Sequence, residues 1–138
     1  MTIEYMAGIL DGEGSISILK SGQRKDGLAF WKLVIQVTSA SQELIDWIYS
    51  TFGGYKYIEE HKDRRRTYYK WMLLCRHASD FLTYLLPHLK VKKRQAQIGI
   101  QFQTSVLPPT GSSGKRTEEV YLFQTKLREE LLELNKRL

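Results

Sequence analysis

Two carboxylates near the N-terminus stand two residues apart and alternate with glycines. The segment reads Asp11, Gly12, Glu13 and Gly14. Carboxylate oxygens are ligands that a hard divalent cation such as Mg²⁺ prefers, and glycines leave the neighbouring backbone carbonyls accessible as further ligands. The pattern indicates a site for a divalent cation. The alternative is that Glu13 is an ordinary surface carboxylate in a turn.

A helix and a strand are expected on either side of this acidic segment. Residues 2–11 read as a short apolar helix that contains the small residues Ala7 and Gly8. Small residues on a helix let another backbone approach closely. Residues 15–21 alternate in the manner of a strand, with Ile16 and Ile18 on one face. The carboxylates are therefore expected at a sharp connection between a helix and a sheet.

Periodicity along the rest of the chain predicts an α+β fold. Alternating apolar residues predict three further strands, at residues 29–38, 55–60 and 66–75. Helical spacing predicts four further helices, which begin at the capping residues Ser39, Ser79 and Thr117 and at about residue 91. The order αββαββααα joins two hairpins in one antiparallel four-stranded sheet. Helices are expected on one face of that sheet, and the other face is expected to stay open.

The length and the charge of the chain narrow the class of partner. The chain has 138 residues, which predicts a single domain over residues 1–138. Its formal net charge is +6, and its isoelectric point is about 9.4. This excess of positive charge favours a polyanion over a small acidic molecule as the partner. The alternative is a basic surface that only keeps the protein in solution.

Cysteine usage and hydropathy indicate a compartment. The single cysteine, Cys75, lies in an apolar run and is expected to be a buried thiol, and the CxxC and HxxxH spacings of zinc sites are absent. No apolar stretch approaches the ~20 residues that span a bilayer. The N-terminus lacks the basic region of a signal peptide. We therefore expect no membrane partner and a reducing interior, either the cytoplasm or the inside of an organelle.

The stretch from Met6 to Gly14 (MAGILDGEG) resembles the nine-residue signature of the LAGLIDADG homing endonucleases. The resemblance extends over nearly the whole chain, since residues 81–98 are similar to the region after the fourth strand in those proteins. It implies their αββαββα core with extra C-terminal helices. It also implies a site-specific endonuclease that hydrolyses phosphodiesters in both strands of a long pseudo-palindromic DNA target and thereby promotes intron mobility.

The resemblance assigns roles to individual residues. Glu13 would be a catalytic metal ligand and the Gly12 carbonyl a second ligand, with Mg²⁺ as the ion and Mn²⁺ as a substitute. Lys92 would stabilise developing charge or polarise a water, and the alternative is a solvated lysine. Where well-known members carry Gln and Arg, this chain has Ser39 and Glu43. Ser39 is a candidate to hold the catalytic water, whereas Glu43 cannot replace an arginine electrostatically.

The single copy of the signature has a consequence for assembly. Members of the family with one copy act as homodimers in which the signature helices of two subunits pack together. Ala7 and Gly8 would permit that contact, and Asp11 would cap the end of the partner's helix. The alternative is that Ala7 and Gly8 pack in the core of their own chain. A two-fold dimer predicts a palindromic or pseudo-palindromic target.

The open face of the predicted sheet is expected to bind double-stranded DNA, because the major groove admits a β-ribbon. Strand alternation selects the residues of that face, given that Tyr69, Trp71 and Leu73 point inward. A shift of one residue in the third and fourth strands would exchange their faces. The candidate DNA-binding residues are Ser17, Leu19, Ser21, Gln23, Phe30, Lys32, Val34, Gln36, Tyr55, Tyr57, Glu59, Arg66, Tyr68 and Lys70.

Two other functions are compatible with the same residues. The protein could be a maturase, a splicing cofactor that binds intron RNA, although an intact Glu13 argues against a role confined to RNA. It could also be a regulator that binds specific DNA sequences without cleaving them. Metal-dependent cleavage of duplex DNA distinguishes the nuclease from both.

Overall fold

The computed structural model describes residues 2–23, 27, 29–60, 66–106 and 118–136. The element order confirms the predicted pattern of helices and strands, with one added 3₁₀ turn. The elements are α1 (Ile3–Glu13), β1 (Gly14–Gln23), β2 (Ala29–Ser39), α2 (Gln42–Phe52), β3 (Tyr55–Glu59), β4 (Tyr68–Leu74), α3 (Cys75–Leu85), η1 (Leu86–His88), α4 (Lys93–Thr104) and α5 (Glu118–Lys136). Among the described residues, no helix is both long enough and apolar enough to cross a bilayer.

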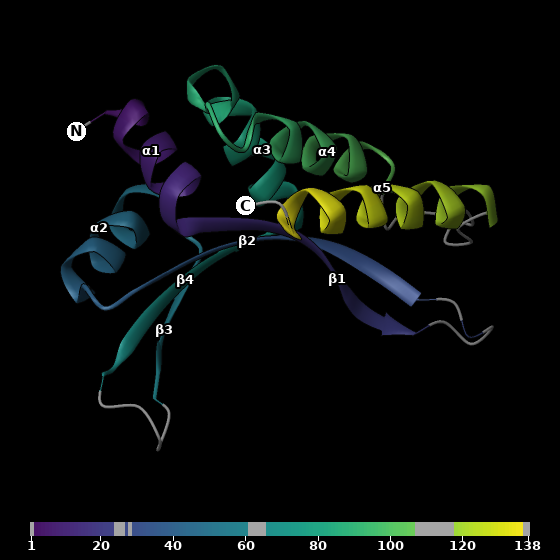
Figure 1. Ribbon diagram of the computed structural model, residues 1–138. Coiled ribbons are helices and arrows are strands. Elements are labelled where there is room, and N and C mark those ends of the chain that lie inside the picture. The colour runs from purple at the N-terminus through teal and green to yellow at the C-terminus, as the bar shows by residue number, and fades with distance from the viewer. Residues whose placement is uncertain (1, 24–26, 28, 61–65, 107–117, 137–138) are drawn as a thin grey trace.

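The four strands form one antiparallel sheet in the order β1-β2-β4-β3. All five α-helices lie on one face of the sheet, and the two hairpins bend away from them (Figure 1). We call the sheet face that carries the helices the helix face, and the opposite one the open face. The predicted α+β fold with helices on one face is therefore confirmed.

The pairing of β4 fixes which residues share a face. Trp71 lies opposite Val37, and Leu73 lies opposite Ile35. All four of these side chains are buried, and the Trp71 Nε1–H donates a hydrogen bond to the Gly53 carbonyl at 2.7 Å. The inward direction expected for the odd-numbered residues of this strand is thus confirmed, and with it the register of the third and fourth strands.

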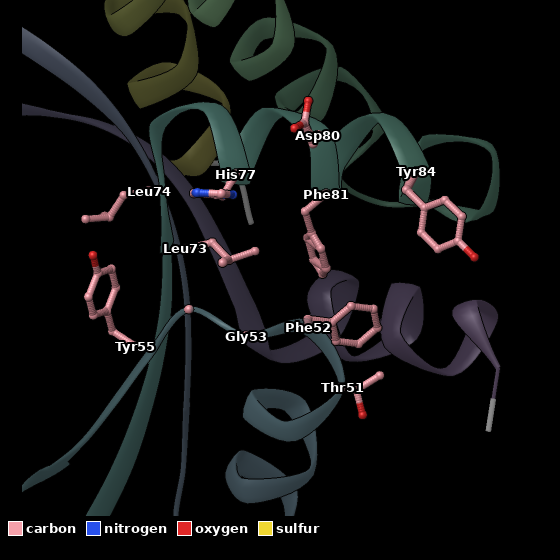
Figure 2. A pocket seen from close by; sticks show the side chains of 11 residues that line it. Thr51, Phe52, Gly53, Tyr55, Leu73, Leu74, His77, Asp80, Phe81 and Tyr84 are labelled. Carbon is pink, nitrogen blue, oxygen red and sulfur yellow. The ribbon is translucent and has the colours of Figure 1, made fainter.

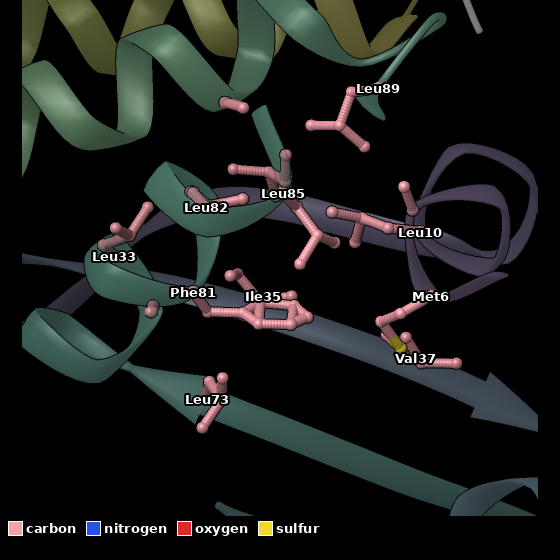
Figure 3. Packing of buried hydrophobic residues seen from close by; sticks show 14 of the residues in the cluster. Met6, Leu10, Leu33, Ile35, Val37, Leu73, Phe81, Leu82, Leu85 and Leu89 are labelled. Atoms are coloured by element: carbon pink, nitrogen blue, oxygen red, sulfur yellow. The ribbon is translucent and has the colours of Figure 1, made fainter. Parts of the chain in front are cut away.

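The main core lies between the helix face and the helices. Met6 and Leu10 of α1 pack with Leu82 and Leu85 of α3 over the buried residues of β2 (Figure 3). All four of these side chains are fully buried, and each contributes roughly 1.5–3 kcal/mol of hydrophobic stabilisation. The first helix is thereby held against the sheet, and its last turn lies at a fixed place beside β1 and β2.

Two predicted helix starts are wrong. The residue that caps α2 is Ser41, whose Oγ accepts a hydrogen bond from the Leu44 N–H at 3.2 Å. Ser39 is instead the last residue of β2, because the strand pairs with β4 up to that position. The third helix begins at Cys75, four residues before the predicted cap at Ser79, because the buried stripe on its inner side already includes residue 78.

The prediction that Cys75 is a buried thiol is also wrong, since the residue is exposed. It has a left-handed backbone with φ of 56°, and it forms the sharp change of direction between β4 and α3. The predicted cap at Thr117 lies outside the described residues.

Substitutions at Gly53 and Gly54 test the connection between α2 and β3. Both residues have left-handed φ values, 73° and 93°. A Cβ on Gly54 would overlap the Met72 carbonyl oxygen, whereas a Cβ on Gly53 meets nothing within 4 Å. We expect Gly53→Ala to lower the free energy of unfolding by ~1–3 kcal/mol through backbone strain alone. Gly54→Ala should cost more than that, because steric overlap adds to the strain. Urea unfolding of both variants measures the difference, and equal losses would contradict the role of the overlap.

Candidate functional site

The acidic segment lies where α1 meets β1. Helix α1 continues to Glu13, and β1 begins at Gly14, which pairs with Val37 of β2. A Cβ on Gly14 would lie 2.5 Å from the end of the Leu10 side chain and 3.0 Å from its Cα, so a larger residue here would force Leu10 to shift. The tight turn places the carboxylate of Glu13 at the junction of helix and sheet.

Glu13 and Gly12 are both exposed. No ion pair or side-chain hydrogen bond engages the Glu13 carboxylate within the described part of the chain. Across the same residues, no three His, Cys, Asp or Glu side chains gather in one place. One chain therefore offers a free carboxylate and an accessible carbonyl. This all-oxygen donor set fits Mg²⁺, which keeps several of its waters and binds through one or two carboxylates.

Asp11 binds backbone groups of its own chain. Its carboxylate accepts hydrogen bonds from the backbone N–H groups of Lys90 at 2.8 Å, Val91 at 3.2 Å and Lys92 at 2.9 Å. These groups belong to the turn that leads into α4 of the same chain, where backbone donors have no helical partner. Asp11 therefore caps this turn of its own chain, and a contact between Asp11 and the partner's helix stays a prediction.

Lys92 lies directly beside the acidic segment, 81 residues away along the chain. Its Nζ donates a hydrogen bond to the Asp11 carbonyl at 2.6 Å, and only 6% of the residue is exposed. Burial lowers the pKa of Lys92, and the Asp11 carboxylate opposes part of this shift. The structure thus brings the Lys92 ammonium to the backbone of Asp11, two residues before Glu13, and the alternative of a solvated lysine is wrong.

Ser39 lies at the end of β2 that borders the acidic segment, two residues beyond Val37. Its Oγ accepts a hydrogen bond from the Ser41 N–H at 3.0 Å, which leaves the hydroxyl proton available for a water. Glu43 is exposed on the first turn of α2, and it lines a small open cavity together with Tyr5 and Trp47.

The small residues of α1 divide between two environments. Ala7 is fully buried in the core of its own chain, so the prediction that it contacts a second chain is wrong. Gly8 is exposed, and a Cβ there would meet nothing within 4 Å. Gly12, one helical turn later, is equally open. The sequence analysis missed Gly12 as part of this surface, although its spacing of four from Gly8 was a usable signal.

The open face contains most of the residues that were predicted to bind DNA. The pairing puts Leu19 opposite Lys32, Tyr57 opposite Lys70, and Glu59 opposite Tyr68. Paired residues share a face, and so do alternate residues along a strand. The predicted residues placed on the open face by this rule are Ser17, Leu19, Phe30, Lys32, Val34, Gln36, Tyr55, Tyr57, Glu59, Tyr68 and Lys70.

Four predicted positions need correction or qualification. Val34 has no exposed surface, so neighbouring side chains prevent it from contacting DNA directly. An irregularity between Lys20 and Gly22 leaves Ser21 unpaired and sets Gln23 opposite Ala29. This shift turns Gln23 to the helix face, and its Nε2 donates a hydrogen bond to the Gly27 carbonyl at 3.1 Å. Arg66 is exposed but precedes β4.

Five residues of the open face were missed. Ser15 pairs with Gln36 and Gly22 with Phe30, and Thr38 pairs with Lys70, Met72 with Gln36, and Leu74 with Val34. The period-two alternation that selected the other residues extends to all of these positions except Gly22, which the irregularity after Lys20 brings to this face.

An open cavity of about 870 Å³ lies between the α2–β3 connection and α3 (Figure 2). Phe52 and Phe81 form part of its wall, and the exposed His77 and Asp80 lie at its margin. Tyr55 is the one predicted site residue in its lining. The candidate chemistry at Glu13 is therefore on an open surface outside this cavity, an arrangement that suits a large substrate.

Comparisons with known proteins identify the fold. No protein-family model and no curated protein matches the chain. The homing endonuclease I-CvuI, solved with a DNA target, matches with a TM-score of 0.75 and 18% identity over 96% of this chain and 80% of its own. The archaeal intron-encoded homing endonuclease I-Vdi141I, complexed with DNA, matches with a TM-score of 0.75 and 20% identity over 96% of this chain and 82% of its own.

A larger protein also matches the fold of this chain. The LAGLIDADG meganuclease I-CpaMI, bound to uncleaved DNA, matches with a TM-score of 0.68 and 16% identity over 92% of this chain but only 42% of its own. This chain has the fold of the LAGLIDADG homing endonucleases.

Proposed function

We propose that this protein is a metal-dependent, site-specific DNA endonuclease. The observation that carries the proposal is the meeting of three groups at the end of an open sheet. The Glu13 carboxylate is free and exposed, the Gly12 carbonyl is accessible, and the buried Lys92 ammonium lies beside Asp11. The DNA-bound homing endonucleases with this fold support the same conclusion.

The residues divide the work of phosphodiester hydrolysis. Glu13 would hold a divalent cation, with the Gly12 carbonyl as a second ligand. When bound, the ion supplies an activated water and neutralises charge at the phosphorus. The Lys92 ammonium stabilises the charge that develops in the transition state. Because its pKa is lowered, Lys92 also gives up a proton to the leaving oxygen more readily than an ordinary lysine does.

Asp11 acts as a positioning residue in this scheme. Its carboxylate binds three successive N–H groups of the turn that carries Lys92. Hydrogen bonds to a charged acceptor each contribute ~1.5–3 kcal/mol. The turn is thus fixed to α1, and Lys92 is held near Glu13 before any substrate binds. The Ser39 hydroxyl, at the adjoining end of β2, is available to orient a water.

A homodimer is the assembly that we propose. The chain matches 80% of I-CvuI but only 42% of I-CpaMI, so it corresponds to about half of the larger protein. Gly8 and Gly12 present an open, small-residue surface on α1, which permits close packing of two helices. Two copies of Glu13 would then supply one carboxylate for each strand of a pseudo-palindromic duplex.

Selection from randomised pseudo-palindromic DNA duplexes tests the function. The library is incubated with the protein in parallel with Mg²⁺, Mn²⁺ and Ca²⁺. We expect one family of sequences to be cut with Mg²⁺ and Mn²⁺, and to be bound but uncut with Ca²⁺. Such a target, found across an intron insertion site, would support a role in intron mobility. Enrichment of uncut duplexes in every arm would contradict the nuclease and favour a DNA-binding protein.

A further inference from the structure

The centre of the open face is apolar rather than charged. Val34 lies between Ser17 of β1 and Leu74 of β4, and Leu19 and Met72 are its diagonal neighbours on the two flanking strands. Leu19 is 37% exposed, whereas Val34 is fully buried beneath its neighbours. We call Leu19, Val34, Met72 and Leu74 the apolar patch. Its accessible surface comes from Leu19, Met72 and Leu74, because Val34 supports them from below without being exposed itself.

Lys32 and Gln36 lie directly opposite Leu19 and Met72, and the polar residues on the β3–β4 side of the apolar patch are engaged with each other. The Lys70 ammonium lies 3.6 Å from the Glu59 carboxylate and 5.7 Å from the centre of the Tyr57 ring. The Tyr57 hydroxyl donates to the Met72 sulfur at 3.3 Å. These contacts satisfy the charged groups on the β3–β4 side of the face. Removal of the apolar patch from water, by contrast, lowers the free energy of the system.

A duplex that binds this face presents one kind of apolar group. In the major groove the base edges carry hydrogen-bond donors and acceptors, and thymine adds its C5-methyl group. The net charge of +6 favours a polyanion over an apolar protein surface. The deep, narrow major groove of an RNA helix does not admit side chains. The chemistry of the apolar patch therefore matches B-form DNA with thymines opposite the sheet centre.

We propose that the apolar patch reads thymine C5-methyl groups in the major groove of the target. The proposal rests on the proposed function and narrows its substrate to DNA that carries thymine, rather than uracil, at those positions. Leu19, on β1, is the main specificity residue, because it is the most accessible member of the apolar patch. Leu74 and Met72 are half-buried members of the apolar patch on β4.

Replacement of thymine by deoxyuridine tests this proposal, because it removes only the methyl group. A duplex pool enriched on the protein with Ca²⁺ is amplified with either dTTP or dUTP, and the dissociation constants of the two forms are compared. We expect the deoxyuridine pool to bind at least about fourfold more weakly, the fold-change that corresponds to ~0.8 kcal/mol for one buried methyl group. Cleavage with Mg²⁺ should continue on both forms.

Two variants separate the proposed contact from general effects of deoxyuridine on DNA shape. In Leu19→Ala the ratio of the two dissociation constants should fall towards one. Leu122→Ala, which truncates a leucine that is 57% exposed on α5, should keep the wild-type ratio. A deoxyuridine pool that binds and is cut as well as the thymine pool would overturn the thymine readout while leaving the nuclease intact. Failure to enrich any duplex would overturn both proposals.

Discussion

Glu13→Gln is expected to abolish metal-dependent cleavage while leaving target affinity nearly unchanged. The amide keeps the shape of the side chain but removes the negative charge that holds a divalent cation. Loss of metal catalysis costs several kcal/mol of transition-state stabilisation, which corresponds to a rate reduction on the order of 10³-fold. Glu13 is exposed at the junction of α1 and β1, so the substitution should not disturb folding. Single-turnover cleavage with Mg²⁺ and equilibrium binding with Ca²⁺ measure the two effects separately.

A matched control is Glu119→Gln, which neutralises another exposed carboxylate on α5. This variant should cleave at the wild-type rate, because the C-terminal part of α5 lies beside the start of β1, where Asn135 bonds the Ile16 carbonyl, and Glu119 is at the opposite end of that helix. If Glu13→Gln and wild-type protein cleaved at similar rates, the proposed ligand role of Glu13 would be wrong. If binding and cleavage fell together, the residue would serve DNA binding rather than catalysis.

Gly8→Leu is expected to convert the proposed dimer into a folded monomer that makes no double-strand cuts. A Cβ at Gly8 meets nothing within 4 Å of its own chain, so the larger side chain is tolerated there. Leucine is also a better helix former than glycine by roughly 0.8–1 kcal/mol, so the free energy of unfolding of the monomer should rise rather than fall. The bulk would, however, separate two helices that pack through glycine. Sedimentation equilibrium measures the association, and thermal unfolding measures the fold.

The graded variant Gly8→Ala provides the comparison for this test. Alanine is small, so association of two chains should weaken far less than with leucine. Alanine also favours the helix over glycine, as leucine does, so the effect on helix stability is similar in the two variants. A dimer that survives Gly8→Leu unchanged would show that two chains meet through another surface. Loss of folding in Gly8→Leu, seen as a lowered melting temperature, would show that the glycine is needed within its own chain.

The sequence by itself determined the parts of the fold that depend on local periodicity. Alternation in β2 and β4 marked Val37 and Trp71 as core residues, because a strand presents successive side chains to opposite faces. The sharp connection between the first helix and the first strand followed from residue type as well, since glycines stand at positions 12 and 14. The acidic segment and its connection to a strand could therefore be placed before any contact between distant residues was known.

Only the tertiary structure decided what lies beside that segment. The contact between Lys92 and Asp11 joins residues 81 apart in sequence, and the capping of residues 90–92 by Asp11 arises because α4 starts next to the end of α1. No local pattern encodes such an approach, since it depends on how the helices pack on the sheet. The same holds for Gln23, which changes face through an irregularity in strand pairing, and for Val34, which its neighbours on three strands remove from solvent. Periodicity assigns a residue to a face, but pairing and packing between distant elements decide which face is open and which side chains remain accessible on it.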